Sequence, residues 1–418
     1  MSTKLEYVPL ESCRICGNTN LVVILDLGDQ YLSGVFPKDI TVAIQKAPLV
    51  LVKCLDNSDG CGLVQLAHTF DLPTMYGETY GYRSGLNQSM VNHLNSKFQK
   101  ISRFLKLNEG DIVIDIAGND GTFLSNFPKS LNLCSIDPTS EKFRKYFRKD
   151  IDYIADFFSA KNFYKKFGES KAKLVTSFSM FYDLEDPCAF AKEVAEILDP
   201  EEGIWVLEQS YLPEMIKTNS FDTICHEHLS YYGMHQLKRI LDSAQLKIID
   251  VEFNDINGGS ISLVVARDSS VYLHDSQKVN SILKTENVTG INTLEVWDSF
   301  RSSIEACKET FLEILDSCKK KNMRICAIGA STKGNVTLQT WSLSGSDIEV
   351  VGDVNPDKFG HLTPGSWIPI VSEDEVLAEN FDVYVILPWH FRDFFTSNQK
   401  FVGRTLLFPL PIPELVLV

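Results

Sequence analysis

The sequence predicts an α/β protein with three parts: a small N-terminal domain over residues 1–75, a central doubly wound Rossmann-like domain over 76–270, and a second Rossmann-like α/β domain over 271–418. Three observations predict this division. Cysteines cluster near the start of the chain, apolar strands alternate with helical patterns from residue 112 onward, and a new alternating block begins at residue 324. Such alternation is typical of a mostly parallel sheet with helices on both faces. A chain of 418 residues is long enough for two or three domains, each with its own core.

The expected elements follow from hydrophobic periodicity and turn residues. An amphipathic helix is expected from residue 89 to 107, and a long helix from 297 to 321. Strands are expected at 49–52, 63–66, 112–116, 174–178, 204–208, 324–329 and 383–387, and two more end at residues 137 and 353. A closing hairpin is expected over 248–253 and 260–265, because Asn257-Gly-Gly259 joins these segments.

Composition and charge narrow the class of protein. Lys and Arg number 40 against 55 Asp and Glu, and the net charge of −15 opposes non-specific nucleic-acid binding. The 44% of hydrophobic residues exclude disordered and fibrous classes. No apolar run approaches the length of a membrane span, and the first residues lack the apolar core of a signal peptide. We therefore expect a cytoplasmic protein, a monomer or weak dimer, with neither a membrane nor a nucleic acid as partner.

Four cysteines near the N-terminus have the pattern of a metal site. Cys13 and Cys16 form a CxxC followed by a glycine, and Cys54 and Cys61 follow about forty residues later, again with a glycine directly after the second. Two such pairs on tight turns are close to a four-thiolate zinc knuckle, although six residues separate the second pair. Four separate buried cysteines or a redox CxxC are the alternatives.

An aromatic, glycine-rich segment follows over residues 75–85 and includes Tyr80 and Tyr82. Its three tyrosines and three glycines are compatible with plain turn structure. They are equally compatible with a lid that offers phenol groups to a pocket.

A glycine turn follows the strand at 112–116 and opens a helix, which is where α/β sheets bind nucleotide-like ligands. We expect Asp115, Gly118, Asn119 and Gly121 to contact such a ligand, with the two glycines letting it approach the backbone. Asp137 ends the next strand, at the position from which a carboxylate binds the ribose hydroxyls of an adenosine.

Both NAD and S-adenosylmethionine fit this spacing, and a turn without a ligand stays open as a third reading. The turn itself favours the methyl donor, because an acidic side chain beside a pyrophosphate would repel it whereas a sulfonium cation tolerates acids. Asp156 and Phe157 add a carboxylate for the adenine amine and an aromatic face for its ring.

The segment over residues 220–232 concentrates histidines, acids and tyrosines. His226 and His228 could ligate a metal or lie in a satisfied polar turn. Acid/base chemistry is the third reading, because a histidine oriented by a carboxylate such as Glu227 can remove a proton at neutral pH.

A second glycine turn, over residues 329–335, follows the strand at 324–328. Ser331, Lys333 and Asn335 could form an anion cradle for a phosphate or diphosphate at a helix N-terminus. The Gly-Lys-Ser/Thr order of a Walker loop is absent, and an ordinary glycine turn is the alternative.

Taken in this order, the motifs resemble the three-domain sugar C-methyltransferases that act on nucleotide-linked 4-keto-deoxyhexoses in branched-sugar biosynthesis. The resemblance covers nearly the whole chain, from the CxxC to the turn at 329–335. It implies a four-cysteine zinc domain, a central domain that binds S-adenosylmethionine, and a C-terminal domain that helps to bind a nucleotide-diphosphate-linked keto-sugar.

The resemblance also implies roles for single residues. It places the general base at His228 with Glu227 beside it, Cys225 and His226 at the substrate, and the phenols of Tyr80, Tyr82 and Tyr231 near the oxyanion. The base would remove the hydrogen on the carbon next to the ketone, C-3, and the carbanion would then attack the methyl group.

Two departures from the family pattern bear on the substrate contacts. Family members carry a tyrosine where Cys225 stands and a histidine in the stretch that here reads Ser179-Met-Phe-Tyr-Asp183. The alternatives to a methyltransferase are an NAD-dependent nucleotide-sugar epimerase or dehydrogenase and an inactive nucleotide-sugar-binding protein.

Overall fold

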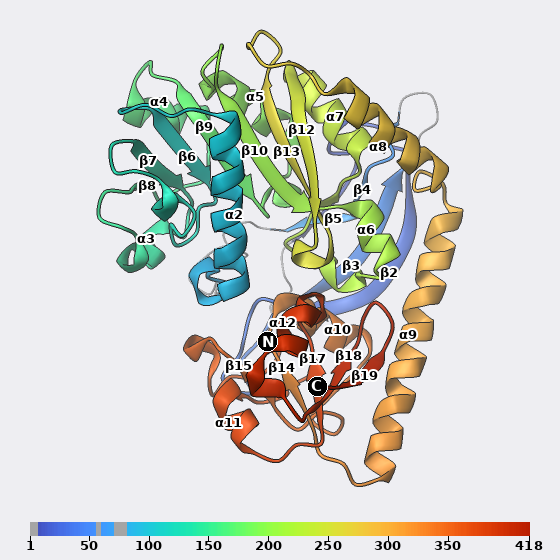
Figure 1. Ribbon diagram of the computed structural model, residues 1–418. Helices are drawn as coiled ribbons and strands as arrows, with labels where there is room; N and C mark the ends of the chain where they lie inside the picture. Colours follow the sequence, from blue (N-terminus) through green and yellow to red (C-terminus); the bar gives the residue numbers. More distant parts are fainter. Residues whose placement is uncertain (1–6, 56–59, 71–81) are drawn as a thin grey trace.

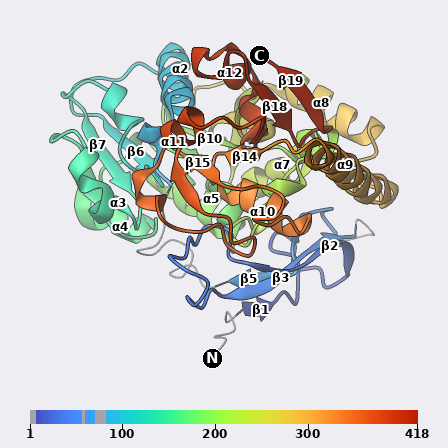
Figure 2. The same cartoon turned by 90° about the horizontal axis from the view of Figure 1, so that it is seen from below.

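The computed structural model describes residues 7–55, 60–70 and 82–418. The central domain lies above the C-terminal domain in Figure 1. In the view from below, the N-terminal strands lie against one side of these two larger domains (Figure 2). The described helices include none that combines the length and the apolar composition needed to cross a bilayer.

The N-terminal domain forms a small antiparallel sheet that borrows a strand from the central domain. Its order is β11-β4-β3-β2, in which β11 belongs to the central domain and pairs with β4. A separate pair joins β1 to β5. The bounds are β1 (Tyr7–Pro9), β2 (Leu21–Tyr31), β3 (Lys46–Cys54), β4 (Val64–Leu66), β5 (His68–Phe70) and β11 (Ser230–Tyr231).

The central domain contains a seven-stranded sheet of order β12-β13-β10-β9-β6-β7-β8. Strands β6 to β10 are parallel, whereas β13 runs antiparallel to β10 and to β12 and closes the sheet as the predicted hairpin. The bounds are β6 (Ile112–Ile116), β7 (Asn132–Ile136), β8 (Asp152–Ile154), β9 (Ala172–Phe178), β10 (Ile204–Ser210), β12 (Leu246–Asn254) and β13 (Ser260–Arg267).

Both faces of this sheet are buried, which is why β6 is apolar at four of its five positions. On one face Val113 packs with Met90, Leu94 and Ile101 of α2. On the other face the isoleucines of β6 pack with α4, α5 and α7. The helices are α2 (Gln88–Phe104), α3 (Ser140–Phe143), α4 (Ala160–Phe167), α5 (Pro187–Ile197), α6 (Leu212–Lys217), α7 (Met234–Ser243) and α8 (Ser276–Val288).

The C-terminal domain contains a six-stranded sheet of order β16-β15-β14-β17-β18-β19, parallel except for its last strand. Helix α9 leads into it and runs along its side, as Figure 1 shows. The strands are β14 (Ile325–Ile328), β15 (Val351–Asp353), β16 (Ile370–Ser372), β17 (Val383–Ile386), β18 (Thr405–Phe408) and β19 (Glu414–Leu417). The helices are α9 (Glu295–Lys320), α10 (Thr332–Thr340), α11 (Glu373–Ala378) and α12 (Arg392–Ser397).

The fold confirms the predicted class of two Rossmann-like α/β domains behind a small cysteine-bearing domain. The predicted helix at 89–107 is α2, and the long helix at 297–321 is α9. Helix α8 packs on α7 and β12, with Val279 buried in the central core.

Candidate active site

The four N-terminal cysteines converge on one point. Their sulfur atoms all lie within 4.8 Å of one another, with Cys13 Sγ 3.4 Å from Cys61 Sγ and Cys16 Sγ 3.6 Å from Cys54 Sγ. The glycine after each knuckle has a left-handed backbone, with φ of 71° at Gly17 and 72° at Gly62, so a side chain would strain either turn. Four converging thiols fit a tetrahedral zinc ion and exclude the reading of four unrelated buried cysteines.

A cavity of about 280 Å³ opens at the carboxyl ends of the parallel strands of the central sheet. Gly118 lies in its wall, and a Cβ atom there would lie 2.5 Å from Ser135 Oγ. The backbone of this turn is left-handed at Ala117, Asn119 and Gly121, with φ of 56°, 52° and 74°. Left-handed non-glycine residues are held at a cost and cluster at ligand sites, so this turn marks the cavity as a candidate ligand site.

The charged side chains that the structure describes in the cavity wall are all acidic, which favours a cationic ligand. Its lining includes the carboxylates of Asp115, Asp137, Asp183 and Glu185, and its described lining residues include neither Lys nor Arg. Burial raises the pKa of Asp115 to about 7, even though Thr176 Oγ1 donates to it at 2.6 Å. Such a lining suits a cationic ligand and would repel a pyrophosphate, which favours a sulfonium compound over a dinucleotide.

Asp137 lies where the sequence predicts it, at the end of β7 and in the cavity wall. Its carboxylate accepts hydrogen bonds from the backbone N–H groups of Asn119 at 2.9 Å and Thr139 at 2.6 Å. Oδ1 also accepts from Thr139 Oγ1 at 2.6 Å. The carboxylate therefore holds the glycine turn in place, and Oδ2 retains a second lone pair for a ligand hydroxyl.

Phe157 lines the cavity, and Phe158 beside it packs on Phe190 with ring centroids 5.2 Å apart. Asp156 does not line the cavity. Its carboxylate accepts from Phe157 N at 2.8 Å and from Asn162 Nδ2 at 2.9 Å, so it is bonded within its own loop. The contact of Asp156 with an adenine amine stays a prediction.

The segment before α2 closes over the glycine turn. Ser84 N donates to Asn119 Oδ1 at 3.0 Å, Asn119 Nδ2 donates to the Tyr82 carbonyl at 3.1 Å, and Gly85 N donates to Asp120 Oδ2 at 2.9 Å. Tyr82 also lines the cavity. Tyr80, predicted as an oxyanion partner, lies outside the described residues.

His228 occupies a different environment from that of the donor cavity. Its Nδ1 lies 2.7 Å from the carbonyl oxygen of Thr223, and its ring centroid lies 4.2 Å from that of Tyr182. Because a carbonyl oxygen can only accept a hydrogen bond, Nδ1 donates and carries the proton, and Nε2 carries the lone pair. Burial lowers the pKa of His228 to about 3, so the ring is neutral at pH 7 and its Nε2 keeps a lone pair.

The residues around His228 in the sequence, Glu227, Cys225 and Tyr231, lie where the domains meet. Burial raises the pKa of Glu227, and its Oε2 has no hydrogen-bond partner among the described residues. Cys225 is fully buried, and Tyr231 lies in β11 with 4% of its surface exposed. Gly34 of the N-terminal domain approaches Glu227 so closely that a Cβ atom there would lie 3.0 Å from Oε1.

His226 faces away from this region and into the N-terminal domain. Its Nε2 lies 3.2 Å from the carbonyl oxygen of Ala47, and its ring meets the edge of Phe70 with centroids 5.0 Å apart. Only 1% of its surface is exposed. The geometry supports an interdomain packing role for His226, whereas the sequence suggested a substrate contact.

The loop over residues 179–183 connects the two environments. Ser179, Met180 and Asp183 line the donor cavity, while Tyr182 lies against His228. Sequence reasoning flagged this stretch as a departure and assigned it no role. The available signal was its position directly after β9, at the same sheet edge as the glycine turn.

The polar side chains of the C-terminal turn at 329–335 hydrogen-bond to protein groups, one within α10 and two in the other domains. Ser331 caps α10 by accepting from Gly334 N at 3.0 Å, and Asn335 Nδ2 donates to the Ser33 carbonyl at 2.7 Å. Lys333 Nζ donates to the Asn257 carbonyl at 2.6 Å. The predicted phosphate cradle therefore has its three polar side chains engaged with protein, and phosphate binding there stays a prediction.

Two further residues at this junction were missed by sequence reasoning. Trp389 Nε1 donates to Asp222 Oδ2 at 2.8 Å, which joins the C-terminal domain to the helical turn Phe221–Thr223. His390 follows Trp389, and its buried Nδ1 has no partner among the described residues. Neither stands in a motif, because only the packing of two domains brings them here.

Three family models match consecutive parts of the chain: a zinc binding domain over residues 13–76, a methyltransferase domain over 91–251, and a C-methyltransferase C-terminal domain over 255–413. The chain is also 27% identical over 416 residues to the C-methyltransferase NovU of Streptomyces niveus, an alignment that covers 97% of this chain and 96% of that protein.

Similar solved structures include the magnesium protoporphyrin IX methyltransferase of Synechocystis PCC 6803, at 12% identity and a TM-score of 0.31, over 44% of this chain and 80% of that one. An S-adenosylmethionine-dependent methyltransferase from Clostridium acetobutylicum is similar at 12% identity and a TM-score of 0.31, over 43% and 92% of the two chains. The order of the three matching domain models and the full-length relative agree with the cysteine cluster and the acidic cavity. The chain therefore has the domain organisation of a C-methyltransferase that depends on S-adenosylmethionine, with a zinc-binding domain at its N-terminus.

Proposed function

We propose that the enzyme methylates the carbon next to the ketone of a nucleotide-linked 4-keto-sugar, at C-3, with His228 as the general base. One observation carries this proposal: the loop at 179–183 has one side in the acidic cavity and the other against the neutral imidazole of His228. An acceptor beside that loop would lie between a methyl donor and a base.

The methyl donor fits the cavity by chemistry and by shape. Asp137 is suited to ribose hydroxyls, Phe157 to an adenine face, and Gly118 and Asn119 to close backbone approach. The acidic lining is suited to the ammonium and sulfonium charges. S-adenosylmethionine supplies an electrophilic methyl group and leaves as a neutral thioether.

The acceptor chemistry follows from the state of His228. Its Nε2 lone pair takes the proton from the carbon alpha to the ketone, and the C–H electron pair moves onto the carbonyl oxygen as an enolate. The Thr223 carbonyl keeps the ring in the required tautomer. The enolate carbon then forms the new C–C bond while the bond from sulfur to methyl breaks. Tyr231, and Tyr82 and Tyr80 from the segment before α2, are the proposed hydrogen-bond donors to the enolate oxygen.

The experiment is methyl transfer in vitro. Purified protein with S-adenosylmethionine and a nucleoside-diphosphate-linked 4-keto-6-deoxyhexose should yield a product heavier by one CH₂ unit, with the new methyl on C-3 by NMR. Transfer to oxygen or nitrogen, or transfer only to acceptors without a ketone, would overturn the proposal. Binding of both ligands without transfer would instead support an inactive binding protein, and a retained nicotinamide absorbance would support a dehydrogenase.

A further inference from the structure

Lys333 extends from the C-terminal domain to the turn that closes the central sheet. It lies in the first turn of α10, and its ammonium donates to the carbonyl of Asn257, in the turn between β12 and β13. Trp389 of the same domain packs on this turn so closely that a Cβ atom on Gly258 would lie 3.2 Å from its ring. The C-terminal domain therefore holds the turn at two points.

The same asparagine contacts the donor cavity. Asn257 Nδ2 donates to Ser179 Oγ at 3.1 Å, and Ser179 lines the cavity. Both residues have left-handed backbones, with φ of 58° at Asn257 and 53° at Ser179. Because non-glycine residues adopt this conformation at a cost, their surroundings must hold them there.

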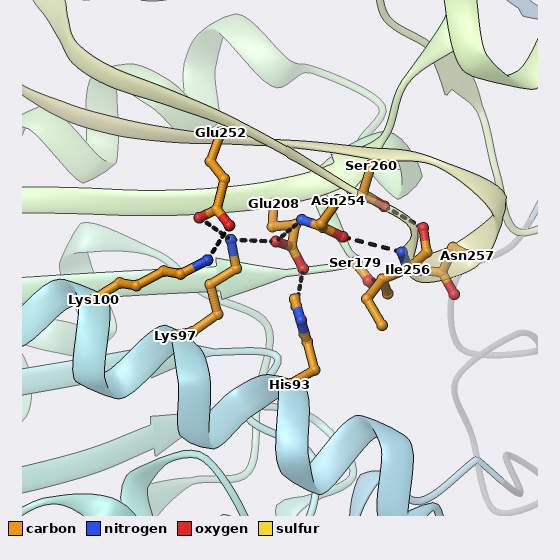
Figure 3. Close-up of polar contacts among 10 residues, drawn as sticks. All are labelled: His93, Lys97, Lys100, Ser179, Glu208, Glu252, Asn254, Ile256, Asn257 and Ser260. Atoms are coloured by element: carbon orange, nitrogen blue, oxygen red, sulfur yellow. Dashed lines mark hydrogen bonds and ion pairs between the residues drawn. The ribbon is translucent and has the colours of Figure 1, made fainter. Parts of the chain in front are cut away.

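The other end of the turn is fixed to the central domain by the network in Figure 3. Asn254 Nδ2 donates to Glu208 Oε2 at 2.8 Å, and Asn254 Oδ1 accepts from Ile256 N at 3.1 Å. Glu208 also binds His93 at 2.5 Å and Lys97 at 2.6 Å, both on α2.

The network ties the turn to a second wall of the cavity, since α2 also provides Met90 and Leu94 to its lining. The bonds of Asn254 come from the central domain itself. The hydrogen bond to the Asn257 carbonyl comes from another domain, through Lys333.

We propose that Lys333 is a positioning residue for the methyl donor: through Asn257 it fixes Ser179 at the edge of the donor cavity, so that docking of the C-terminal domain sets donor affinity. This rests on the proposed placement of the donor in that cavity. In this role Lys333 acts without touching either substrate, and the carboxylate of Asp222 lies near enough to stabilise its buried charge.

The test is the affinity for S-adenosylhomocysteine by calorimetry on the full-length protein. Lys333→Met should weaken binding about tenfold, the size expected when a charge-assisted hydrogen bond is lost. Asn257→Gly is the second variant, because glycine accepts the left-handed backbone and keeps the carbonyl but removes the amide that holds Ser179. It should weaken binding to a similar degree.

Two comparisons separate positioning from general destabilisation. Lys358→Met is the matched control, because Lys358 is a partly buried lysine of the same domain that donates to a backbone carbonyl, that of Ala330, at 2.7 Å. It should leave donor affinity unchanged. In the Asn257→Gly background, Lys333→Met should add little, because both changes break one connection.

The outcomes distinguish this inference from the proposed function. Gly118→Ala should abolish donor binding if the donor occupies the cavity, and unchanged affinity there would overturn the donor placement itself. Loss of binding in Gly118→Ala together with wild-type affinity in both Lys333→Met and Asn257→Gly would overturn the positioning role alone. Additive effects of the two substitutions would do the same.

Discussion

The donor cavity and the region around His228 are built in different ways. The cavity lies within one domain, where the end of β6, the glycine turn and the two residues after it form part of the lining. The helix predicted to open at this turn is only the short 3-10 helix Leu124–Asn126. The region around His228 needs three domains: the loop at Gly34, the segment at 222–232, and the C-terminal residues Lys333 and Trp389. A cavity built within one domain can exist whenever that domain is folded, and the C-terminal domain acts only on Ser179 at its edge, through Lys333 and Asn257. The acceptor side, meaning the region around His228, depends as a whole on how the domains meet.

The largest expected effect is at the acceptor side. His228→Asn removes the proton acceptor but keeps a hydrogen-bonding amide, and we expect kcat to fall by about 10²- to 10⁴-fold, the range for loss of a general base. Steady-state kinetics of methyl transfer will measure it. His226→Asn is the control, because this histidine faces Ala47 and Phe70. A larger loss at His226 than at His228 would reverse the two assignments.

Removing zinc should affect the acceptor side and spare the donor side. Strand β4 of the zinc domain pairs with β11, and Leu66 N donates to the Leu229 carbonyl at 2.9 Å, next to His228. Thiolate ligation couples the metal to folding of this domain. A chelator should therefore lower kcat by up to about 10²-fold, because a misplacement of about 1 Å can cost that much. Calorimetry should find the affinity for S-adenosylhomocysteine almost unchanged. If that affinity fell by as large a factor as kcat, the donor cavity would not be independent of the zinc domain.

On the donor side, Asp137→Ala should weaken S-adenosylhomocysteine binding by roughly tenfold or more, because a charge-assisted hydrogen bond is worth about 1.5–3 kcal/mol. Asp156→Ala is the comparison variant at the same sheet edge, and it should weaken binding less, since Asp156 is bonded within its own loop. Titration calorimetry distinguishes the two. If Asp156→Ala weakens binding as much as Asp137→Ala, the loop at 156–158 must rearrange around the donor.

The smallest effect concerns pH and stability. Burial lowers the pKa of His226 to about 4, below the value of about 6.5 in an unfolded chain. The folded state keeps this ring neutral, so its contribution is fully present above pH 6.5 and is lost as the pH falls from 6.5 toward 4. Between pH 7 and 5.5, the free energy of unfolding of wild type should therefore fall by about 1 kcal/mol more than that of His226→Gln. Urea unfolding at both pH values gives the difference, and parallel losses would contradict the depressed pKa.

The positions of several cavity residues could be predicted from the sequence because their signals are local, whereas their contacts with a donor stay a prediction. Asp115, Gly118 and Asp137 occupy fixed places at the ends of two neighbouring strands, and the fold brings them into one wall. The hairpin around Asn257 and the long helix α9 were also predicted, from turn residues and apolar spacing.

The contacts between domains could not be predicted in this way. The turn at 329–335 has the same strand, glycine and helix pattern as the turn at 118–121, and the pattern suggested a ligand at both. What differs is the opposing surface: a cavity faces Gly118, whereas Asn257 and Ser33 face Lys333 and Asn335. A local pattern holds no information about which domain will pack opposite it, and the same reason explains why the orientation of His226 was missed.

The most direct test of the account is hydrogen exchange at the carbon next to the ketone, followed by NMR in heavy water. With S-adenosylhomocysteine bound, methyl transfer cannot occur, but proton removal by His228 can. We predict that wild type exchanges the C-3 hydrogen of the 4-keto-sugar nucleotide for deuterium, and that His228→Asn binds both ligands without exchange. Exchange at the wild-type rate in His228→Asn would contradict the central claim that this histidine is the base.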